Sequence, residues 1–497
     1  MAETLSVPPE ENSEQSFASG VSDDAIPAGA SAMDSAENVS AKLKDVSSER
    51  RKRVVSGMRP TGPLHIGHFF GALSNWLKLQ EEYDCYFFVA DWHALTTHYA
   101  DTSLVAQNTL EVATDWLSVG VDPEKAKVFI QSSVPEHAEL HLLLSMITPL
   151  GWLERVPTYK EQIENLRDKD LGTYGFLGYP LLQTADIVIY DADFVPVGED
   201  QVPHVELSRE VVRRFNFMFG LRWKSRGFEW AINDGDALRI LTALPLTEAS
   251  GGQGESSIKY LQAIGQVGIE NFRQKLGEER FNRYFDEKLI LVAPGHLLTE
   301  TPRLTGTDGR RMAKSYGNAI WLKDSVEEIR AKAKNMMTDP ARVRRTDPGN
   351  PDVCPVFSYH KLFSDAGTID LVNRDCRTAA IGCVDCKRMM ADGLIRWIAP
   401  VQARRRQYEA NPARVWEILD AGSKTARETA QQTMARVRNA VFHWDDARRK
   451  ASDPATEFAS TQPLAGAELT DVTAPAAKPP ETTKSKPKGT SLPAEGK

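Results

Sequence analysis

The segment that decides the fold of this chain is a turn-rich stretch that reads Gly57-Met58-Arg59-Pro60-Thr61-Gly62-Pro63-Leu64-His65-Ile66-Gly67-His68. A β-prone run at 53–56 precedes it, and the apolar spacing from Leu64 to Leu77 predicts an amphipathic helix after it. His65 and His68 should then lie on the first helical turn, where free N–H groups and the helix dipole suit a phosphate. Two surface histidines at helical spacing are the simpler alternative.

A second basic loop follows far downstream and reads Gly309-Arg310-Arg311-Met312-Ala313-Lys314-Ser315-Tyr316-Gly317-Asn318. A mobile cation in such a loop stabilises charge that develops on a leaving group more in the transition state than in the ground state. Taken alone, a basic loop between two glycines is equally typical of a solvated turn.

Together the two segments resemble the paired signatures of class I aminoacyl-tRNA synthetases. Members of this family bind ATP in a Rossmann-like domain and activate an amino acid as its adenylate. The resemblance implies that Lys314, His65 and His68 are catalytic. Arg311 stands where the family has its first lysine, and Ala313 replaces a hydroxyl residue. The ATP-binding residues implied in the two segments are Arg59, Pro60, Thr61, Gly67, His68, Arg311, Met312, Ala313, Lys314 and Ser315.

Composition limits the class of protein. A chain of 497 residues with 41% hydrophobic content predicts two or three domains. A net charge of −8 argues against a protein that coats nucleic acid indiscriminately, and we expect no DNA partner. No run of 18 apolar residues and no secretory leader is visible, so we expect no membrane partner. Five cysteines do not suggest a disulfide scaffold, and we expect a cytoplasmic protein.

Strands expected at 85–91 and 127–131 alternate with helices expected at 104–119 and 138–150, which is typical of a parallel sheet covered by helices. The predicted fold class is therefore α/β: a Rossmann-like parallel-sheet catalytic domain, followed by an α-helical domain that the resemblance makes anticodon-binding. The expected divisions are a disordered tail at 1–48, the first catalytic part at 49–222, an insertion at 223–288, the second catalytic part at 289–330, the helical domain at 331–450 and a disordered tail at 451–497.

The run Asp91-Trp92-His93-Ala94 lies where an expected strand ends, which is the place for ligand contacts in α/β folds. It also resembles an Asp-x-His-Ala motif of the family. A carboxylate that caps the next helix explains Asp91 equally well.

A mostly apolar helix predicted from Leu181 to Tyr190 contains a single carboxylate, Asp186. A buried carboxylate needs a partner, and an indole N–H is one candidate, since it donates and cannot accept. A hydrogen bond to a neighbouring protein group is the alternative. The segment resembles the tryptophan-binding helix of bacterial tryptophanyl-tRNA synthetases. The tryptophan-binding residues that this resemblance implies are Asp186, Tyr179, Gln183 and, downstream, Gln201.

Residues 195–204 predict a strand, a turn and the start of a helix at 202–215. The resemblance assigns contacts with ATP and the amino acid to the turn, through Gly198, Glu199, Asp200 and Gln201. An ordinary turn that caps a helix is the alternative. In the insertion that follows, a flexible loop is expected at 250–254 beside a helix at 258–267, and its role stays unassigned.

Four cysteines, Cys354, Cys376, Cys383 and Cys386, lie within about 33 residues. Four thiolates at such spacing hold a tetrahedral zinc or an iron–sulfur cluster. The segment resembles that of tryptophanyl-tRNA synthetases with a four-iron four-sulfur (4Fe-4S) cluster. We therefore expect a 4Fe-4S cluster, with zinc or free thiols as alternatives.

The last helical part is basic on an acidic protein, which favours tRNA binding over a merely solvated face. The residues concerned are Arg396, Arg404, Arg405, Arg406, Arg414, Lys424, Arg427, Arg436 and Arg438.

The resemblance as a whole implies a homodimeric enzyme that activates L-tryptophan with ATP and magnesium and transfers it to tRNA(Trp). A tyrosine-specific ligase of the same fold and a non-catalytic tRNA-binding relative are the alternatives. A simple nucleotidyltransferase would explain neither the basic helices nor the cysteines.

Overall fold

The computed structural model describes residues 50–156, 172–246, 253–298 and 304–452. Described residues up to Val441 form one compact unit, and those from Phe442 belong to a second, which contains helix α21 (Trp444–Ser452). The features below all lie in the first unit. The predicted tails fall outside the described residues, apart from 451–452 at the end of α21.

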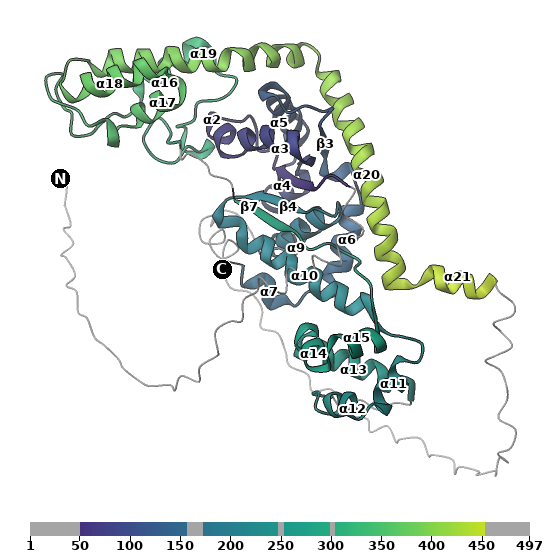
Figure 1. The fold of residues 1–497 in the computed structure, drawn as a ribbon. Coiled ribbons are helices and arrows are strands. Elements are labelled where there is room, and N and C mark those ends of the chain that lie inside the picture. Colours follow the sequence, from purple (N-terminus) through teal and green to yellow (C-terminus); the bar gives the residue numbers. More distant parts are fainter. Residues whose placement is uncertain (1–49, 157–171, 247–252, 299–303, 453–497) are drawn as a thin grey trace, which may run out of the picture. The chain divides into compact units, whose positions relative to one another are not determined.

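A five-stranded, wholly parallel sheet forms the centre of the first unit, in the order β3-β2-β1-β4-β7 (Figure 1). The predicted parallel α/β fold is therefore confirmed. The strand order reverses between β1 and β4, and ligands bind at such a switch point in open α/β sheets. The strands are β1 (Arg53–Met58), β2 (Asp84–Val89), β3 (Ala126–Ile130), β4 (Phe194–Val197) and β7 (Gly295–Leu298).

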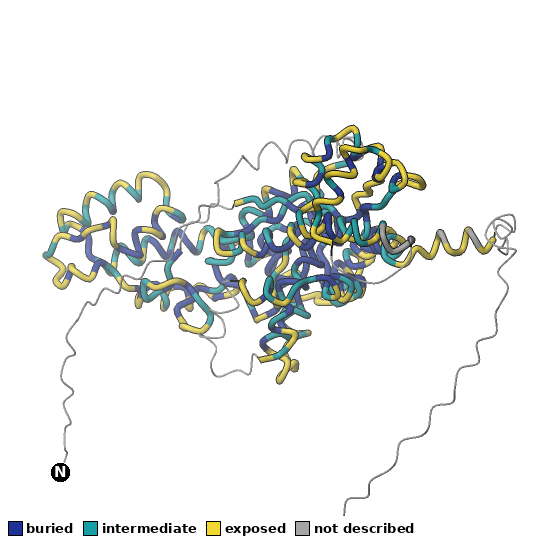
Figure 2. Tube along the Cα trace, turned by 90° about the horizontal axis from the view of Figure 1, so that it is seen from below, coloured by how far each residue is buried: buried dark blue, intermediate teal, exposed yellow. Residues whose placement is uncertain are grey.

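Alternate side chains of the strands enter two different cores. Val54 and Phe87 belong to one apolar cluster, whereas Val55 and Phe88 belong to the other. Because both faces are covered, β2 is buried along residues 85–89. Buried residues gather in the middle of the first unit (Figure 2). Helices that contribute to the first core are α3 (Ser74–Glu82), α5 (Val105–Val119), α16 (Val326–Asn335), α17 (Pro355–Phe363), α18 (Ala366–Arg377) and α19 (Cys383–Ala410). Those of the second are α6 (Glu136–Ser145), α7 (Leu150–Glu154), α9 (Tyr174–Val188) and α10 (Val202–Gly220), and α20 (Pro412–Phe442) contributes to both cores.

Helical structure follows β1 as predicted. It begins as α2 (Ile66–His68), continues as a π-helical turn (Phe69–Leu73) and becomes α3. Other boundaries differ from expectation, among them the helix predicted from Leu181 to Tyr190, which is α9 and ends at Val188. The strand expected at 85–91 ends at Val89, because Asp91 begins α4 (Asp91–His98). The helix expected at 138–150 is two helices, α6 and α7, and Pro149 caps the second. Helix α10 runs five residues further than 215, to Gly220.

The insertion has an apolar core of its own beside a two-stranded antiparallel sheet. Of the loop expected at 250–254, residues 250–252 lie outside the described residues, and Gln253 already begins a helix. The elements are β5 (Leu221–Trp223), α11 (Gly227–Asn233), α12 (Gly235–Thr242), α13 (Gln253–Val267), α14 (Ile269–Leu276), α15 (Glu278–Tyr284) and β6 (Phe285–Glu287).

Helix α20 (Pro412–Phe442) approaches the edge strand β3 closely at Gly422. A Cβ atom at Gly422 would fall well inside van der Waals contact with the carbonyl oxygen of Val128. The helix covers the edge of the sheet there, which leaves that part of β3 less open to pairing with another chain.

We expect Gly422→Ala to lower the free energy of unfolding by about 1–3 kcal/mol, because the clash is between two backbones and neither can rotate away. Gly175→Ala is the matched control: nothing lies within 4 Å of its Cβ position on α9, so alanine should gain up to about 1 kcal/mol. Denaturant unfolding of both variants measures the difference. Equal stability of the two variants would contradict the close approach.

Candidate functional site

A cavity of about 430 Å³ opens where β1 and β4 end, at the switch point of the sheet. Its wall includes Gly57, Met58 and Arg59 from the end of β1 and the loop after it. Strand β4 and the following turn contribute Val197, Gly198 and Gln201, and helix α9 supplies Tyr179, Gln183 and Asp186. The structure therefore brings six predicted site residues into one cavity: Arg59, Tyr179, Gln183, Asp186, Gly198 and Gln201.

The α9 residues reach the cavity because their spacing of four and then three residues places them on one helix face. Thr173 caps the helix by accepting a hydrogen bond from the Phe176 N–H. Asp186 is 1% exposed, so the sequence-based expectation of a buried carboxylate is confirmed.

Asp186 has hydrogen-bonding partners within the protein, as the second alternative predicts, and it also lines the cavity, so an indole partner stays a prediction. Oδ1 contacts His137 Nδ1 at 2.6 Å, and Oδ2 contacts His93 Nε2 at 2.7 Å. Gln131 Nε2 donates to both oxygens, at 2.8 and 2.9 Å. Burial opposes ionisation of Asp186, but the hydrogen bonds from His137 and His93 outweigh it and hold its pKa well below the usual range. Asp186 is thus a fixed anionic acceptor.

His137 joins Asp186 to a buried phenol. Its Nε2 lies 2.5 Å from the hydroxyl of Tyr190, whose pKa burial raises well above the usual value. The phenol therefore keeps its proton and donates it to Nε2. The tautomer of His137 with hydrogen on Nδ1 then satisfies both contacts and directs that hydrogen at Asp186.

The turn after β4 only partly meets the expectation. Gly198 and Gln201 line the cavity, whereas Glu199 and Asp200 are exposed on a 3₁₀ turn (Glu199–Gln201) and do not. A Cβ atom at Gly198 would lie 2.8 Å from Asp200 Oδ1, so a larger residue there would displace the exposed Asp200 side chain.

The two signature segments meet at a second place. Lys314 Nζ donates to the carbonyl oxygen of Gly62 at 2.8 Å and to Thr61 Oγ1 at 3.2 Å. The Lys314 loop is held by Asn318, which accepts from the Ala313 N–H at 3.0 Å and donates to the Arg311 carbonyl at 3.1 Å. This loop is therefore a fixed turn whose lysine faces the first segment. None of the described residues that line the cavity comes from this loop.

His65 is the N-cap of α2 and His68 its last residue, so both lie on the first turn as predicted. Their rings are 3.7 Å apart, and the His65 N–H donates to His68 Nδ1 at 3.2 Å. Burial, with Lys314 nearby, lowers the pKa of His65 to about 4, and burial together with His65 lowers that of His68 to about 3. Both imidazoles are neutral at pH 7 and offer hydrogen bonds rather than charge.

The hydrogen bonds of Asp91 indicate a structural role and not a ligand contact. Its Oδ1 accepts from the N–H groups of Trp92 and Ser132, both at 3.0 Å, and Oδ2 from the Ser132 hydroxyl. It ties the start of α4 to the end of β3, while His93 of the same run lines the cavity.

The four cysteines gather from three helices. Cys354 is the N-cap of α17, Cys376 lies on α18, and Cys383 and Cys386 lie on the first turn of α19. Burial first, and then the charges of the other three thiols, raise the pKa of Cys386 to about 12. Arg342 Nη1 donates to Cys376 Sγ at 3.8 Å. Within the described ranges, no three His, Cys, Asp or Glu side chains are placed to hold a single metal ion.

Most residues of the expected basic face have partners within the protein, although Arg414, Arg427 and Arg436 are still exposed; the tRNA surface stays a prediction. Arg396, Arg406 and Lys424 are exposed. The others have intramolecular partners, namely Arg404 with the Ser118 carbonyl, Arg405 with Asp115, Arg414 with Glu417, Arg427 with Glu136, Arg436 with Asp191 and Arg438 with Glu139.

Sequence reasoning missed His137 and assigned Arg405 to tRNA binding, although each carries a readable signal of burial. His137 continues the apolar stripe of Leu140 and Leu144, and Arg405 continues that of Ile398 and Val401. A polar residue on an apolar stripe is buried and must have a partner. Gln131 and Asn318 offer no comparable signal.

Comparisons with known proteins agree with this geometry. A family model described as tRNA synthetases class I (W and Y) matches residues 47–228 and 269–398, and the unmatched stretch between them falls in the insertion. The chain is 51% identical over 397 residues to the tryptophan–tRNA ligase of Ralstonia nicotianae, covering 78% of this chain and 98% of that protein. It is 44% identical to that of Thermotoga maritima, covering 78% and 98%.

Among solved structures, the chain is similar to the tryptophanyl-tRNA synthetase of Campylobacter jejuni complexed with ADP and tryptophan, with a TM-score of 0.59 and 26% identity. The match covers 78% of this chain and 99% of that one. Among the described residues, no helix is both long enough and apolar enough to cross a membrane.

Proposed function

Because the chain belongs to the class I tRNA synthetases of the tryptophan and tyrosine group, we propose that the site described above joins tryptophan to tRNA(Trp). The overall activity is that of an ATP-dependent tryptophan–tRNA ligase. The observation that carries the assignment of residues is Asp186, a buried anionic acceptor in the wall of the cavity at the switch point.

Tryptophan occupies the cavity, with its indole N–H donating to Asp186 and its ring between Tyr179 and Gln183. Gln201, at the other end of the cavity wall, meets the amino acid near its ammonium group. The amide oxygen of Gln201 suits this role, since an ammonium group only donates.

ATP lies between the two signature segments, against Arg59–Thr61, Gly67 and His68 on one side and Arg311–Ser315 on the other. Gly198, Glu199 and Asp200 face its ribose. The neutral imidazoles of His65 and His68 donate hydrogen bonds to phosphate oxygens, and Lys314 supplies the charge. Magnesium accompanies ATP as the counter-ion of its phosphates.

In the first step, a carboxylate oxygen of tryptophan attacks the α-phosphorus of ATP. A new P–O bond forms, the bond to the β-phosphate oxygen breaks, and pyrophosphate leaves with the negative charge. No side chain is required as a base, because the attacking carboxylate carries no proton. Catalysis is then positioning and charge stabilisation, with Lys314 on the leaving pyrophosphate. In the second step a hydroxyl of the tRNA terminal ribose displaces AMP.

Tryptophan-dependent exchange of labelled pyrophosphate into ATP tests this function, with tyrosine and no amino acid as controls. We expect exchange with tryptophan alone, followed by charging of tRNA(Trp). Exchange with tyrosine alone would establish the tyrosine-specific alternative. Binding of tRNA without exchange by either amino acid would establish the non-catalytic one.

We also propose that Cys354, Cys376, Cys383 and Cys386 hold a 4Fe-4S cluster, with zinc as the alternative. The four thiols influence one another, which supports a shared ligand. They are not arranged tightly around one ion, and a four-iron cluster, being larger, holds its thiolates further apart than a single zinc does. The cluster would be structural or face the tRNA, because adenylate formation transfers no electrons.

Iron, acid-labile sulfide and zinc measured on protein purified without air decide between the two. We expect iron and sulfide in equal amounts in the wild type, and both to be lost in Cys376→Ser. Exchange activity with tryptophan gives an independent readout. Zinc without sulfide would overturn the cluster.

For tRNA, the exposed Arg396, Arg406 and Lys424 are the contacts we propose on α19 and α20.

For the homodimer, we propose the apolar surface of Leu142, Met146 and Leu150, which are 53%, 72% and 58% exposed at α6 and α7. Sedimentation of the wild type and of Met146→Glu measures the oligomeric state. Since none of the five cysteines forms a disulfide, we propose that the enzyme works in the reducing cytoplasm.

A further inference from the structure

Arg405, near the end of α19, is a buried guanidinium with only 3% of its side chain exposed. Its Nη1 pairs with Asp115 of α5, its Nη2 lies 2.7 Å from Glu111 Oε2, and its Nε lies 2.8 Å from Glu409 Oε1. Each nitrogen of the guanidinium thus has a carboxylate partner, which a buried charge requires.

Asp115 leads from Arg405 to the first signature segment. It is fully buried, and while Oδ1 pairs with Arg405, Oδ2 accepts from the backbone N–H of Leu64 at 2.7 Å. Leu64 directly precedes His65. The carbonyl of Leu64 in turn accepts from the Leu322 N–H at 3.0 Å. One carboxylate therefore holds the backbone at the point where the chain after the Lys314 loop pairs with the first segment.

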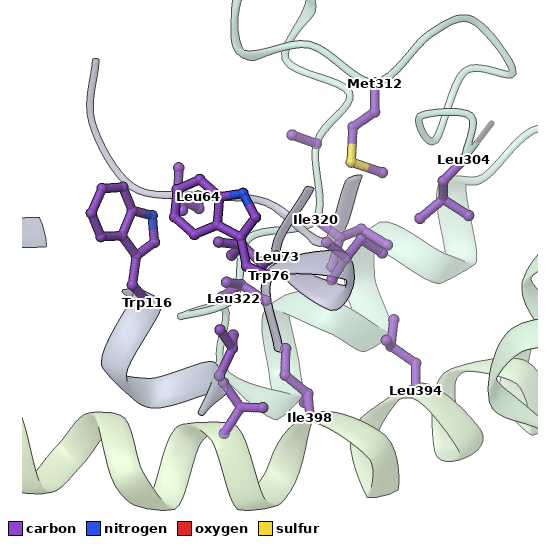
Figure 3. Close-up of a cluster of buried hydrophobic side chains, with 14 of the residues drawn as sticks. Leu64, Leu73, Trp76, Trp116, Leu304, Met312, Ile320, Leu322, Leu394 and Ile398 are labelled. Carbon is purple, nitrogen blue, oxygen red and sulfur yellow. The ribbon is translucent and has the colours of Figure 1, made fainter. Parts of the chain in front are cut away.

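Helix α19 also contacts the chain after the Lys314 loop, and helix α5, directly. Gln402 Nε2 donates to the Asp324 carbonyl at 2.7 Å, and Arg404 Nε to the Ser118 carbonyl at 2.6 Å. Leu394 and Ile398 of α19 lie in one apolar cluster with Leu64, as Figure 3 shows. The apolar packing sets the distance between α19 and the first signature segment. The ion pair between Arg405 and Asp115 sets the orientation of the segment's backbone.

We propose that Arg405 and Asp115 form a positioning pair for the ATP-binding segment: they fix the Leu64 N–H, and with it the backbone course of Thr61–His68, without touching substrate. This inference rests on the proposal that the segment binds ATP. Arg405 belongs to a helix that sequence reasoning assigned to tRNA, so the pair links that helix to adenylate formation.

Two properties of the site argue that the pair does more than add stability. Buried ion pairs contribute little net stability compared with apolar groups of the same size, so stability alone explains the arrangement poorly. Burial raises the pKa of Asp115 to about 6 even though Arg405 opposes this, so loss of Arg405 would leave the carboxyl protonated at neutral pH. The negative charge of Asp115 also favours the charged form of Lys314.

The test is steady-state pyrophosphate exchange by the full-length protein carrying Arg405→Met, Arg405→Lys or Asp115→Asn. We expect Arg405→Met to lower kcat/KM for ATP about tenfold while the KM for tryptophan changes less than about twofold, and Arg405→Lys to recover part of the loss. The double variant Arg405→Met with Asp115→Asn should be no worse than the worse single variant, because the two residues act as a unit. Arg330→Met, which removes an exposed guanidinium of α16 that pairs with Asp392 of α19 at 2.8 Å, is the charge control and should behave as wild type.

A merely structural pair predicts a different result, in which the kinetics of ATP and tryptophan worsen together with stability, or neither changes. Either would overturn the inference, and so would an additive double variant. If Arg405→Met does not fold, Asp115→Asn provides the test instead. Its loss of kcat/KM for ATP is then compared with its change in the KM for tryptophan. Lys314→Ala separates this inference from the proposed function: if that variant also leaves ATP kinetics unchanged, the ATP assignment of the loops itself fails.

Discussion

Replacement of Lys314 with alanine should lower the turnover of tryptophan-dependent pyrophosphate exchange by about 10²–10³-fold and leave the KM for tryptophan near the wild-type value. The ammonium group of Lys314 contacts Gly62 and Thr61 of the first signature segment. The leaving pyrophosphate is proposed to lie at the same place. Its charge acts mainly when negative charge develops on the leaving group, so the loss appears in kcat. The tryptophan cavity does not include the loop, so tryptophan binding should be unaffected.

Arg310→Ala is the matched control for Lys314, because it removes a cation from the same loop. The Arg310 guanidinium pairs with Asp308 at 2.7 Å and does not face the first segment. We expect its exchange activity to stay near the wild-type value. The specific role of Lys314 would be contradicted if Lys314→Ala were as active as the wild type. It would also be contradicted if Arg310→Ala were as impaired as Lys314→Ala.

The pH dependence of kcat/KM for ATP tests the role of Lys314 in a second way. Burial lowers the pKa of Lys314 to about 8, against the influence of Asp115, which raises it. The cation is fully present below that pH and is lost as the pH rises through it. We therefore expect kcat/KM for ATP to fall on the alkaline side with an apparent pKa near 8. Lys314→Arg should move this limb to higher pH, since a guanidinium keeps its proton.

The sequence predicts those parts of the fold whose signals are local. The apolar runs at β2 and β3, the helix of α5 and the loop after β1 were all visible as periodic patterns bounded by turn residues. Strand β7 was not predicted. It is four residues long, and its pairing with β4 is a long-range contact with no local signature.

The candidate site likewise contains residues with a local sequence signal and residues without one. Asp186 could be predicted, because a carboxylate in an apolar helix calls for a partner, but the identity of those partners could not. His137, Gln131 and His93 reach it from three separate elements. Arg405 was misinterpreted because Arg404–Arg406 reads as a solvated basic run. A helix turns about 100° per residue, so the middle arginine of three points away from its neighbours' faces and toward the core.

Asp186→Asn should raise the KM for tryptophan by about 5- to 150-fold, the equivalent of one unpaired buried hydrogen-bonding group at 1–3 kcal/mol, without raising the KM for ATP. The direction follows from the partners of the two oxygens. His137, which does not line the cavity, donates to Oδ1, whereas His93, which does, contacts Oδ2, and Gln131 donates to both oxygens. The single carbonyl oxygen of asparagine is held on the His137 side, so its NH₂ group faces the indole N–H, donor against donor.

An amino acid analogue in which sulfur replaces the indole N–H distinguishes this hydrogen bond from a general disturbance of the pocket. The wild type should prefer tryptophan over the analogue in kcat/KM, because the analogue cannot donate to Asp186. In Asp186→Asn the preference should fall to about one or reverse, because the indole then meets a donor while the sulfur does not. Asp91→Asn is the control, since that carboxylate binds Trp92 and Ser132 instead of lining the cavity, and should keep the preference. If Asp186→Asn loses activity toward both substrates equally, the carboxylate only supports the pocket, and recognition of the indole must lie elsewhere in its wall.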